Sequence, residues 1–317
     1  MQTAGLLPIG TTCSGDIGYD AVVRVVNAQV AVVENLDVFT PIHDDPYTQG
    51  QIVACNATND VHVMGVTDVL SLQALLAYPE ELPEEVAAGV LRGMNGFMTA
   101  IGSRVTGGQT IRNPWPVFGG VCLGIARPEE IVYPSGARVG DAVVLTKPLG
   151  TQPAMRSYRD LNSPKRDVLL ERFVESDLRQ IQGNAVRVMT KSALEVARVM
   201  RAVGVNAATD VTGFGLIGHA SNIATFSGVD IVVKSVPVIR GTLELADFFG
   251  QKLSKGLGAE TAGGLLCFMR PEKVEKFSAM LQRLGLPCWT IGGTTKPKTK
   301  PAARLAPEVE FIETEFP

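Results

Sequence analysis

An aspartate beside a glycine-rich turn is the most informative chemical feature of this sequence. Asp210 follows Ala207-Ala208-Thr209, and the run Val211–Gly215 comes directly after it. Glycines let a backbone approach a ligand closely, and the helix expected to start here offers free N–H groups to an anion. A carboxylate at the same point can hold a divalent cation. The stretch therefore predicts a site for phosphate and a metal ion.

Two further aspartates flank a predicted β-hairpin. Asp20 begins its first strand and Asp37 lies near the end of its second. A two-residue turn centred on Ala28-Gln29 places Asp20 opposite Asp37. Like charges that face each other destabilise a ladder, so we expect a cation between them. The alternative is that both carboxylates end strands in solvent, because a shift of one residue turns the side chains to opposite faces.

A fourth aspartate lies within a predicted helix. Asn56 and Asp60 are four residues apart and share one helix face. Asn and Asp have a low helix preference, so a bound ligand is a reasonable explanation for them, and an exposed polar face is the alternative. Oxygen ligands from several carboxylates suit Mg²⁺, which is usually shared with substrate phosphates.

Other motifs for nucleotide and metal chemistry are weak. Gly107-Gly108 is predicted to form a tight turn whose backbone N–H groups can face phosphate. There is no GxxxxGK[ST] loop and no GxGxxG after a first strand, which disfavours P-loop and Rossmann sites. His43, His62 and His219 form no pair with metal-ligand spacing, so we expect structural or surface roles for them.

The composition is that of a globular protein without a nucleic-acid or membrane signature. Hydrophobic residues make up 45% of the 317 residues, charged residues 19%, and the net charge is −3. No apolar run is long enough to span a membrane, and the N-terminus lacks a secretory signal. The five cysteines include no CxxC pair, which favours a reducing, cytoplasmic location. Cys55, Cys122 and Cys267 lie in apolar segments and are predicted to be core residues.

The order of predicted elements indicates an α+β chain of two α/β domains, 1–146 and 147–317. Asp45-Pro46 is a helix start signal, a cap followed by a first-turn proline. In the first half we expect strands over 21–26, 30–33, 66–76, 117–126 and 142–146, and helices over 46–64 and 83–102. In the second half we expect helices within 152–203, then strands over 206–211, 231–234 and 265–269 that alternate with helices over 214–226, 243–249 and 273–284.

Motifs spread from about Asp20 to Leu266 match one known family in order. The chain resembles the selenophosphate synthetases (selenide, water dikinases), part of a larger group of purine-synthesis-like synthetases that bind ATP without a P-loop. The matching segments are Asp20 with Asp37, Thr40–Tyr47, Ala54–Asp60, Val105–Thr110, Leu145–Thr151, Ala208–His219 and Glu260–Leu266.

The resemblance implies an activity: ATP, selenide and water give selenophosphate, AMP and phosphate, with Mg²⁺ as cofactor. It also implies a homodimer whose N-terminal domains pair into a β-barrel near the active site, and no nucleic-acid or membrane partner. The family's magnesium-binding aspartates match Asp20, Asp60 and Asp210. Its ATP-contacting positions match Gly18, Tyr19, Asp20, Asp37, Asp60, Gly107, Gly108, Gln109 and Thr110.

The sequence departs from the family at its N-terminus. The family carries a catalytic cysteine or selenocysteine closely followed by a lysine, well upstream of the first aspartate. No lysine occurs here before Asp20, and Cys13 lies too near Asp20 to match, so we expect an incidental loop cysteine. The chain is therefore expected to be a truncated form that binds nucleotide weakly or does not turn over. Glu34-Asn35-Leu36 replaces two usual threonines, and Ala262 replaces a usual serine.

Two other functions fit the same features. One is a related synthetase or kinase that acts on a purine precursor or a thiamine phosphate, although the run Lys147–Gly150 and the phrase Asp210–Gly215 argue against it. The other is a non-catalytic paralogue that binds nucleotide or a partner. Magnesium-dependent heat of nucleotide binding would separate a pure scaffold from the others.

Overall fold

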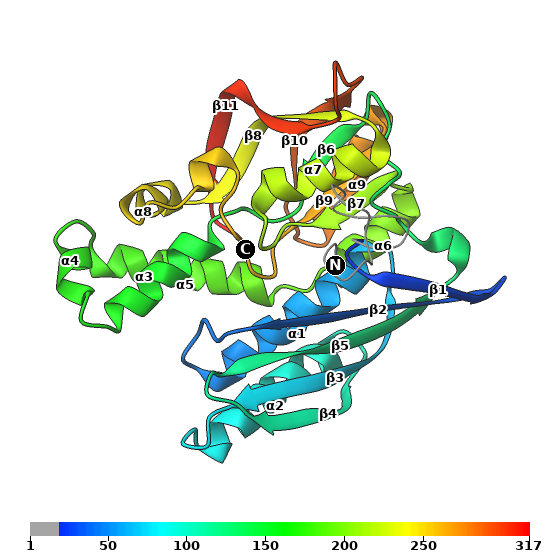
Figure 1. Ribbon diagram of the computed structural model, residues 1–317. Coiled ribbons are helices and arrows are strands. Elements are labelled where there is room, and N and C mark those ends of the chain that lie inside the picture. Colours follow the sequence, from blue (N-terminus) through cyan, green and yellow to red (C-terminus); the bar gives the residue numbers. More distant parts are fainter. Residues whose placement is uncertain (1–18) are drawn as a thin grey trace.

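Two β-sheets with helices packed against them organise the chain (Figure 1). The computed structural model describes residues 19–317. The first sheet has the strand order β1-β2-β5-β3-β4, and the second has the order β11-β8-β10-β6-β9-β7. This arrangement confirms the predicted α+β class. The strands of the first sheet are β1 (Val22–Asn27), β2 (Val30–Phe39), β3 (Asp68–Tyr78), β4 (Val105–Arg112) and β5 (Val117–Ala126).

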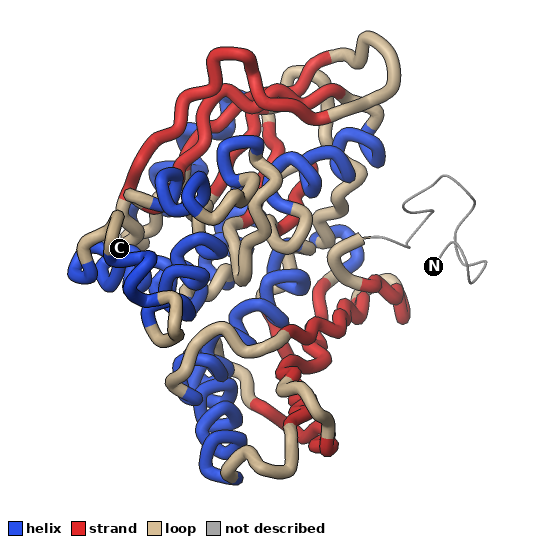
Figure 2. The backbone as a smooth tube through the Cα atoms, turned by 60° about the vertical axis from the view of Figure 1, so that its left-hand side comes forward, coloured by secondary structure: helices blue, strands red, loops and turns tan. Residues whose placement is uncertain are grey.

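Helices α1 (Pro46–Val63) and α2 (Glu84–Ala100) pack side by side on one face of the first sheet (Figures 1 and 2). The predicted start of α1 is confirmed, because the Asp45 side chain accepts from the Thr48 N–H at 2.8 Å and Pro46 is in the first turn. Glycines let the two helices approach closely: a Cβ on Gly50 would lie 2.0 Å from the Val90 carbonyl oxygen. The close contact holds α1 and α2 firmly against each other on the sheet.

The hairpin was predicted correctly, but its register was not. Val23 pairs with Val33, and the ladder shifts between Val25 and Asn27. This irregularity moves the pairing by one residue from the predicted one, and Asp20 lies before β1 begins. The prediction that Asp20 faces Asp37 across the ladder is therefore wrong.

Among the described residues, no helix covers the opposite face of the first sheet. Leu36 and Val38 alternate with less exposed residues along β2 and are 63% and 40% exposed. Leu36 pairs with Val121 of β5, and Val121 pairs with Gln73 of β3, so these side chains share that face. The described residues thus leave an apolar sheet face uncovered.

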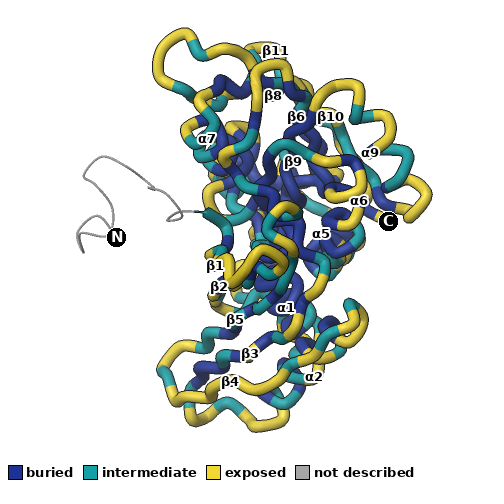
Figure 3. The backbone as a smooth tube through the Cα atoms, turned by 90° about the vertical axis from the view of Figure 1, so that its right-hand side faces the viewer, coloured by how far each residue is buried: buried dark blue, intermediate teal, exposed yellow. Residues whose placement is uncertain are grey.

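The run Val105–Thr110 is an edge strand and not the predicted turn. It belongs to β4, which pairs in parallel with β3 and is mostly exposed (Figure 3). Gly108 has a φ of +146°, and a Cβ there would lie 1.8 Å from the Ala74 carbonyl oxygen. Glycine is needed at this position for close strand pairing, and the sequence signal was misread as a turn.

The second half confirms the predicted alternation of strands and helices and adds two strands that were not predicted. The new strands are β10 (Trp289–Thr295) and β11 (Ala303–Thr314). The other strands of this sheet are β6 (Ala142–Leu145), β7 (Ala207–Asp210), β8 (Asp230–Ile239) and β9 (Leu265–Met269). The helices are α3 (Thr151–Leu161), α4 (Arg166–Leu170), α5 (Glu175–Thr190), α6 (Leu194–Val203), α7 (Gly215–Ser227), α8 (Thr242–Phe248) and α9 (Pro271–Arg283), with short 3-10 turns at Pro128–Glu130 and Leu253–Lys255.

The two halves share a packed junction. One hydrophobic cluster contains Ile52 of α1 together with Met200 of α6 and Phe277 of α9. The strand β6 pairs with β9 and β10 in the second sheet, although it lies before the predicted boundary at 146/147, which stays a prediction. Cys55, Cys122 and Cys267 are buried, as predicted. Within residues 19–317, no helix is both long and apolar enough to cross a membrane.

Candidate functional site

Four aspartates meet where α1 and β2 approach the end of β7. Asp20 precedes β1, Asp37 is on β2, Asp60 is on α1, and Asp210 is the last residue of β7. The charges of Asp20 and Asp37 act on both Asp60 and Asp210. The sequence placed these four residues in separate elements, and the tertiary structure brings them together.

Neutral side chains orient the carboxylates of Asp20 and Asp60. Thr209 donates its hydroxyl proton to Asp20 Oδ1 at 2.8 Å. The Asn35 amide donates to Asp60 Oδ2 at 2.6 Å. Asn35 lies in the run that departs from the family pattern, and it nevertheless supplies a hydrogen bond to the site.

Burial and mutual repulsion disfavour ionisation of the aspartates. Burial raises the pKa of Asp20 to about 7, against the hydrogen bond from Thr209. Burial first, and then the charges of Asp210, Asp20 and Asp37, hold the pKa of Asp60 well above its usual value. The pKa of Asp210 is raised in the same way, while that of Asp37 is raised by burial. Such a cluster is unfavourable as a set of anions unless a cation joins it.

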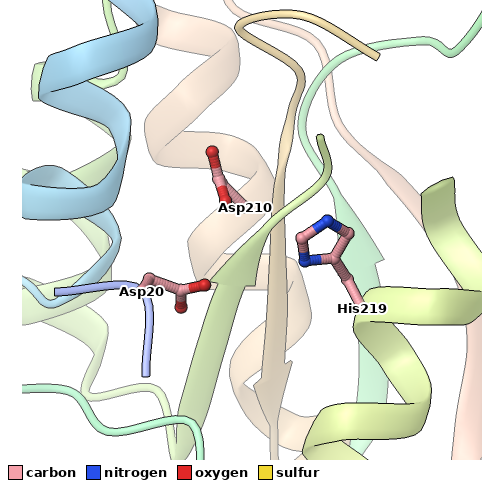
Figure 4. Close-up of side chains that lie close together, drawn as sticks. All are labelled: Asp20, Asp210 and His219. Atoms are coloured by element: carbon pink, nitrogen blue, oxygen red, sulfur yellow. The ribbon is translucent and has the colours of Figure 1, made fainter. Parts of the chain in front are cut away.

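The donor atoms fit a divalent cation. Asp20, Asp210 and His219 each offer one ligand atom, and these atoms lie within 4.8 Å of one another (Figure 4). Asp20 Oδ2 and Asp210 Oδ2 are buried and have no hydrogen-bond partner among the described residues. Buried carboxylate oxygens without partners are costly, and oxygen donors are those that Mg²⁺ prefers.

His219 is a site neighbour that sequence reasoning missed. It was expected to have a structural or surface role, because no other histidine stands at metal-ligand spacing. Its Nε2 accepts from the Thr212 N–H at 3.2 Å, and burial lowers its pKa to about 4. The imidazole is therefore neutral beside the carboxylates and supports the turn after Asp210. His219 lies nine residues after Asp210, a spacing that matches no known metal-ligand motif.

The other two histidines are away from the carboxylates. His62 is buried, with Nδ1 2.9 Å from the Val66 carbonyl oxygen, which confirms a structural role. His43 stacks on Tyr158 with ring centroids 4.9 Å apart. It lines a cavity of about 520 Å³ between the N-terminal loop 41–44 and α3.

The asparagines of α1 link the two halves of the molecule. Asn56 donates to Asp37 through Nδ2 and accepts from the Ala262 N–H at 2.6 Å through Oδ1. Asn59 donates to the Gly263 carbonyl oxygen at 3.1 Å. The sequence pointed to a ligand near Asn56 and Asp60. Asn56 reaches the carboxylate cluster as a hydrogen-bond donor, and its amide oxygen is used by loop 260–264.

A buried lysine completes the site and was missed as a functional residue. Lys147 is 4% exposed and donates to the Ala262 carbonyl oxygen at 2.8 Å. Its charge opposes the rise in the Asp210 pKa, and its Nζ lies 4.0 Å from Cys55 Sγ. The only sequence signal was its position in the run Lys147–Gly150.

Several residues predicted to contact ATP lie away from the four aspartates within this chain. Gly107–Thr110 lie on β4, three strands away from β2. At the usual strand spacing this is about 14 Å. Tyr19 packs its ring edge-on against Phe226, 5.2 Å between centroids. Gly18 and Cys13 lie outside the described residues.

Known family models and curated relatives match this chain over most of its length. The N-terminal domain of AIR synthase related proteins matches residues 18–126, and the C-terminal domain of that family matches residues 138–302. A selenide, water dikinase of Methanococcus maripaludis is 38% identical over 304 residues, which cover 94% of this chain and 89% of that protein. Selenide, water dikinase 2 of Homo sapiens is 32% identical over 98% of this chain and 72% of that protein.

Solved structures share the fold. The structure of AaThiL complexed with AMPPCP and TMP has a TM-score of 0.72 at 18% identity, and covers 96% of this chain and 91% of its own. Hydrogenase maturation protein HypE in complex with ATP has a TM-score of 0.67 at 18% identity, with coverages of 90% and 85%. At these identities the likeness shows the fold alone.

Proposed function

Because this chain belongs to the selenide, water dikinase family, we propose that its protein converts ATP, selenide and water to selenophosphate, AMP and phosphate. The observation that carries the proposal is the convergence of four aspartates from both halves of the molecule. A triphosphate is densely negative, and its transfer requires that charge to be neutralised and held in line.

We assign Asp20, Asp60 and Asp210 as the residues that hold Mg²⁺, and Asp37 as a nucleotide contact. When bound, Mg²⁺ supplies the positive charge that draws the phosphate oxygens to the carboxylates. Thr209 and Asn35 keep Asp20 and Asp60 aimed into the cluster, because each is held by a hydrogen bond below 3 Å. The chain's own side chains therefore pre-organise the site before substrate arrives.

We further propose that a homodimer completes the site. The uncovered apolar face around Leu36 supports burial against a second copy. Strand β4 is an exposed edge far from its own chain's aspartates, so we assign Gly107–Thr110 to the nucleotide site of the partner. Backbone N–H groups of an edge strand are free to face phosphate oxygens.

The test is selenide-dependent formation of AMP by protein made from its complete natural coding sequence. Under anaerobic conditions with ATP and Mg²⁺, we expect AMP and phosphate in equal amounts when selenide is present, and a phosphorus resonance from selenophosphate. Omission of selenide and addition of a chelator serve as controls.

Absence of AMP at every selenide concentration, with folded protein, would contradict the synthetase activity. ADP formed only with thiamine monophosphate or a purine precursor would instead identify a related kinase. A protein that shows no magnesium-dependent heat with an ATP analogue would be a non-catalytic relative.

A further inference from the structure

Ala262 has a strained backbone beside the carboxylate cluster. Its φ is +46°, and it is the sole non-glycine residue with a positive φ among residues 19–317. An alanine in the left-handed region costs free energy, so the surrounding structure must hold it there. Contacts to the backbone of Ala262 must therefore stabilise this conformation.

Two side chains from different halves of the molecule bind the backbone of Ala262. Lys147, two residues after β6, donates a hydrogen bond from its ammonium group to the carbonyl oxygen at 2.8 Å. Asn56, on α1, accepts from the N–H at 2.6 Å. Lys147 and Asn56 are both almost fully buried, so water does not compete strongly for these bonds.

The flanking residues of the same loop are also tied down. The Glu260 carboxylate accepts from the N–H groups of Gly150 and Thr151 at 2.8 Å each. A Cβ on Gly263 would lie 2.0 Å from the Val211 carbonyl oxygen, so loop 260–264 presses against the residue next to Asp210. The loop therefore lies between the Asp210 side and the α1 side of the site.

The hydrogen bonds form a directed series from a cation to a carboxylate. It runs from Lys147 to the Ala262 backbone, from there to Asn56, and from the Asn56 amide to Asp37. Each donor points towards Asp37, which orients the Asn56 amide without ambiguity, since a flipped amide would lose both bonds.

We propose that Lys147 is a positioning residue: it holds Ala262 in the left-handed conformation and thereby fixes Asn56, and through Asn56 the Asp37 carboxylate, at the nucleotide site. Lys147 acts from the second half of the chain on an aspartate of the first half. The spacing of carboxylates from the two halves then depends on this lysine. The expected change in nucleotide affinity rests on the proposed function. The expected change in hydrogen exchange at loop 260–264 does not.

The experiment compares Lys147→Met, Ala262→Gly and the double variant, with Lys234→Met on β8 as an exposed-lysine control. The readouts are the Kd for a nonhydrolysable ATP analogue with Mg²⁺, by calorimetry, and hydrogen exchange of residues 260–264 in the metal-free chain. Lys147→Met should raise the Kd about tenfold, equivalent to losing one well-placed hydrogen bond to a charged group, and should speed exchange at the Ala262 N–H.

The double variant separates positioning from charge. Glycine adopts the left-handed conformation without strain, so Ala262→Gly should restore most of the binding lost in Lys147→Met. Ala262→Gly alone supplies the reference affinity for the double variant. If the double variant binds as weakly as Lys147→Met, the lysine acts only through its charge on Asp210 and the proposal is wrong.

Two further outcomes are informative. If Lys147→Met leaves both the Kd and the exchange of residue 262 unchanged, the proposal fails. If the unmodified chain shows no magnesium-dependent binding, the proposed function fails, while exchange at residue 262 still decides the role of Lys147. Should Lys147→Met not fold, Lys147→Gln is used in the same comparison, and weaker binding rescued by Ala262→Gly is again expected.

Discussion

At the scale of single residues, the site combines buried carboxylates with neighbouring groups that partly stabilise their ionised forms. Asp60 and Asp210 are driven towards their protonated forms by burial and by their neighbours. Thr209, Asn35 and Lys147 offset part of this cost by hydrogen bonds or charge. The unfavourable remainder is what a divalent cation can relieve.

Removing one carboxylate should strongly weaken metal-dependent nucleotide binding. Loss of a partner that merely orients a ligand costs 10–100-fold in metal affinity, so Asp210→Asn should cost about 100-fold or more. Calorimetry with an ATP analogue across Mg²⁺ concentrations measures this. Asp68→Asn, the same change at an exposed position of β3, should leave the affinity unchanged. Equal affinities for the two variants would remove Asp210 from the metal site.

Asp20 should make the metal-free chain less stable as the pH rises. Its folded pKa is about 7 against an ordinary value of 3.8. Below the ordinary value both folded and unfolded chains hold the proton, and between the two values only the folded chain does, so the stability that Asp20 contributes is lost by about pH 7.

Asp20→Asn isolates this effect, because all other titrating groups are shared. In a chelator, the variant should be more stable than the unmodified chain above pH 7, and the gap should close as the pH falls towards 4. Denaturant unfolding at several pH values measures the gap. A gap that widens on acidification would show that the Asp20 pKa is lowered and not raised.

At the scale of elements, helix α1 is the part of the fold on which the site is built. It carries Asp60 towards the other aspartates, and it sends Asn56 and Asn59 across to loop 260–264. Asn56, Asn59 and Asp60 are tolerated in the helix because each has a partner outside it. Strand β4, by contrast, carries glycines because of how closely it pairs with β3.

Gly108 and Gly107 should differ sharply in their tolerance of a side chain. Gly108→Ala places a Cβ against the Ala74 carbonyl and requires a φ that L-residues rarely adopt, whereas a Cβ at Gly107 meets nothing within 4 Å. Gly108→Ala should lower the free energy of unfolding by about 1–3 kcal/mol, and Gly107→Ala by less than about 1 kcal/mol. Equal losses, measured by urea unfolding, would mean that β4 does not pair as described.

At the scale of the whole molecule, the uncovered face of the first sheet is the expected dimer surface. Leu36 is the most exposed large apolar residue of β2. Leu36→Glu should convert dimers to monomers in sedimentation experiments, since burying an unpaired charge at an interface is costly. Leu284→Glu, at an exposed position after α9, is the matched control and should leave the dimer intact. A monomeric unmodified chain would contradict the proposed dimer.

The outline of the fold could be predicted from local patterns. The cap at Asp45, the proline at 46 and the alternation in the second half specified α1 and most strands and helices, because caps and periodicity act over a few residues. Local patterns failed where pairing partners decide the structure. The bulge near Asn27 shifted the hairpin, Gly107-Gly108 joined a strand, and β10 and β11 were not predicted.

The sequence by itself determined which residues could do chemistry: an aspartate beside a glycine turn, three more aspartates in unusual places, and the motifs of one family. Only the tertiary structure decided how they are used. It brought Asp20 and Asp37 to the same site without the predicted pairing, and it buried Lys147 against Ala262. The reason is that residue type sets charge and hydrogen-bonding capacity, whereas burial and contacts across long sequence separations set pKa and orientation.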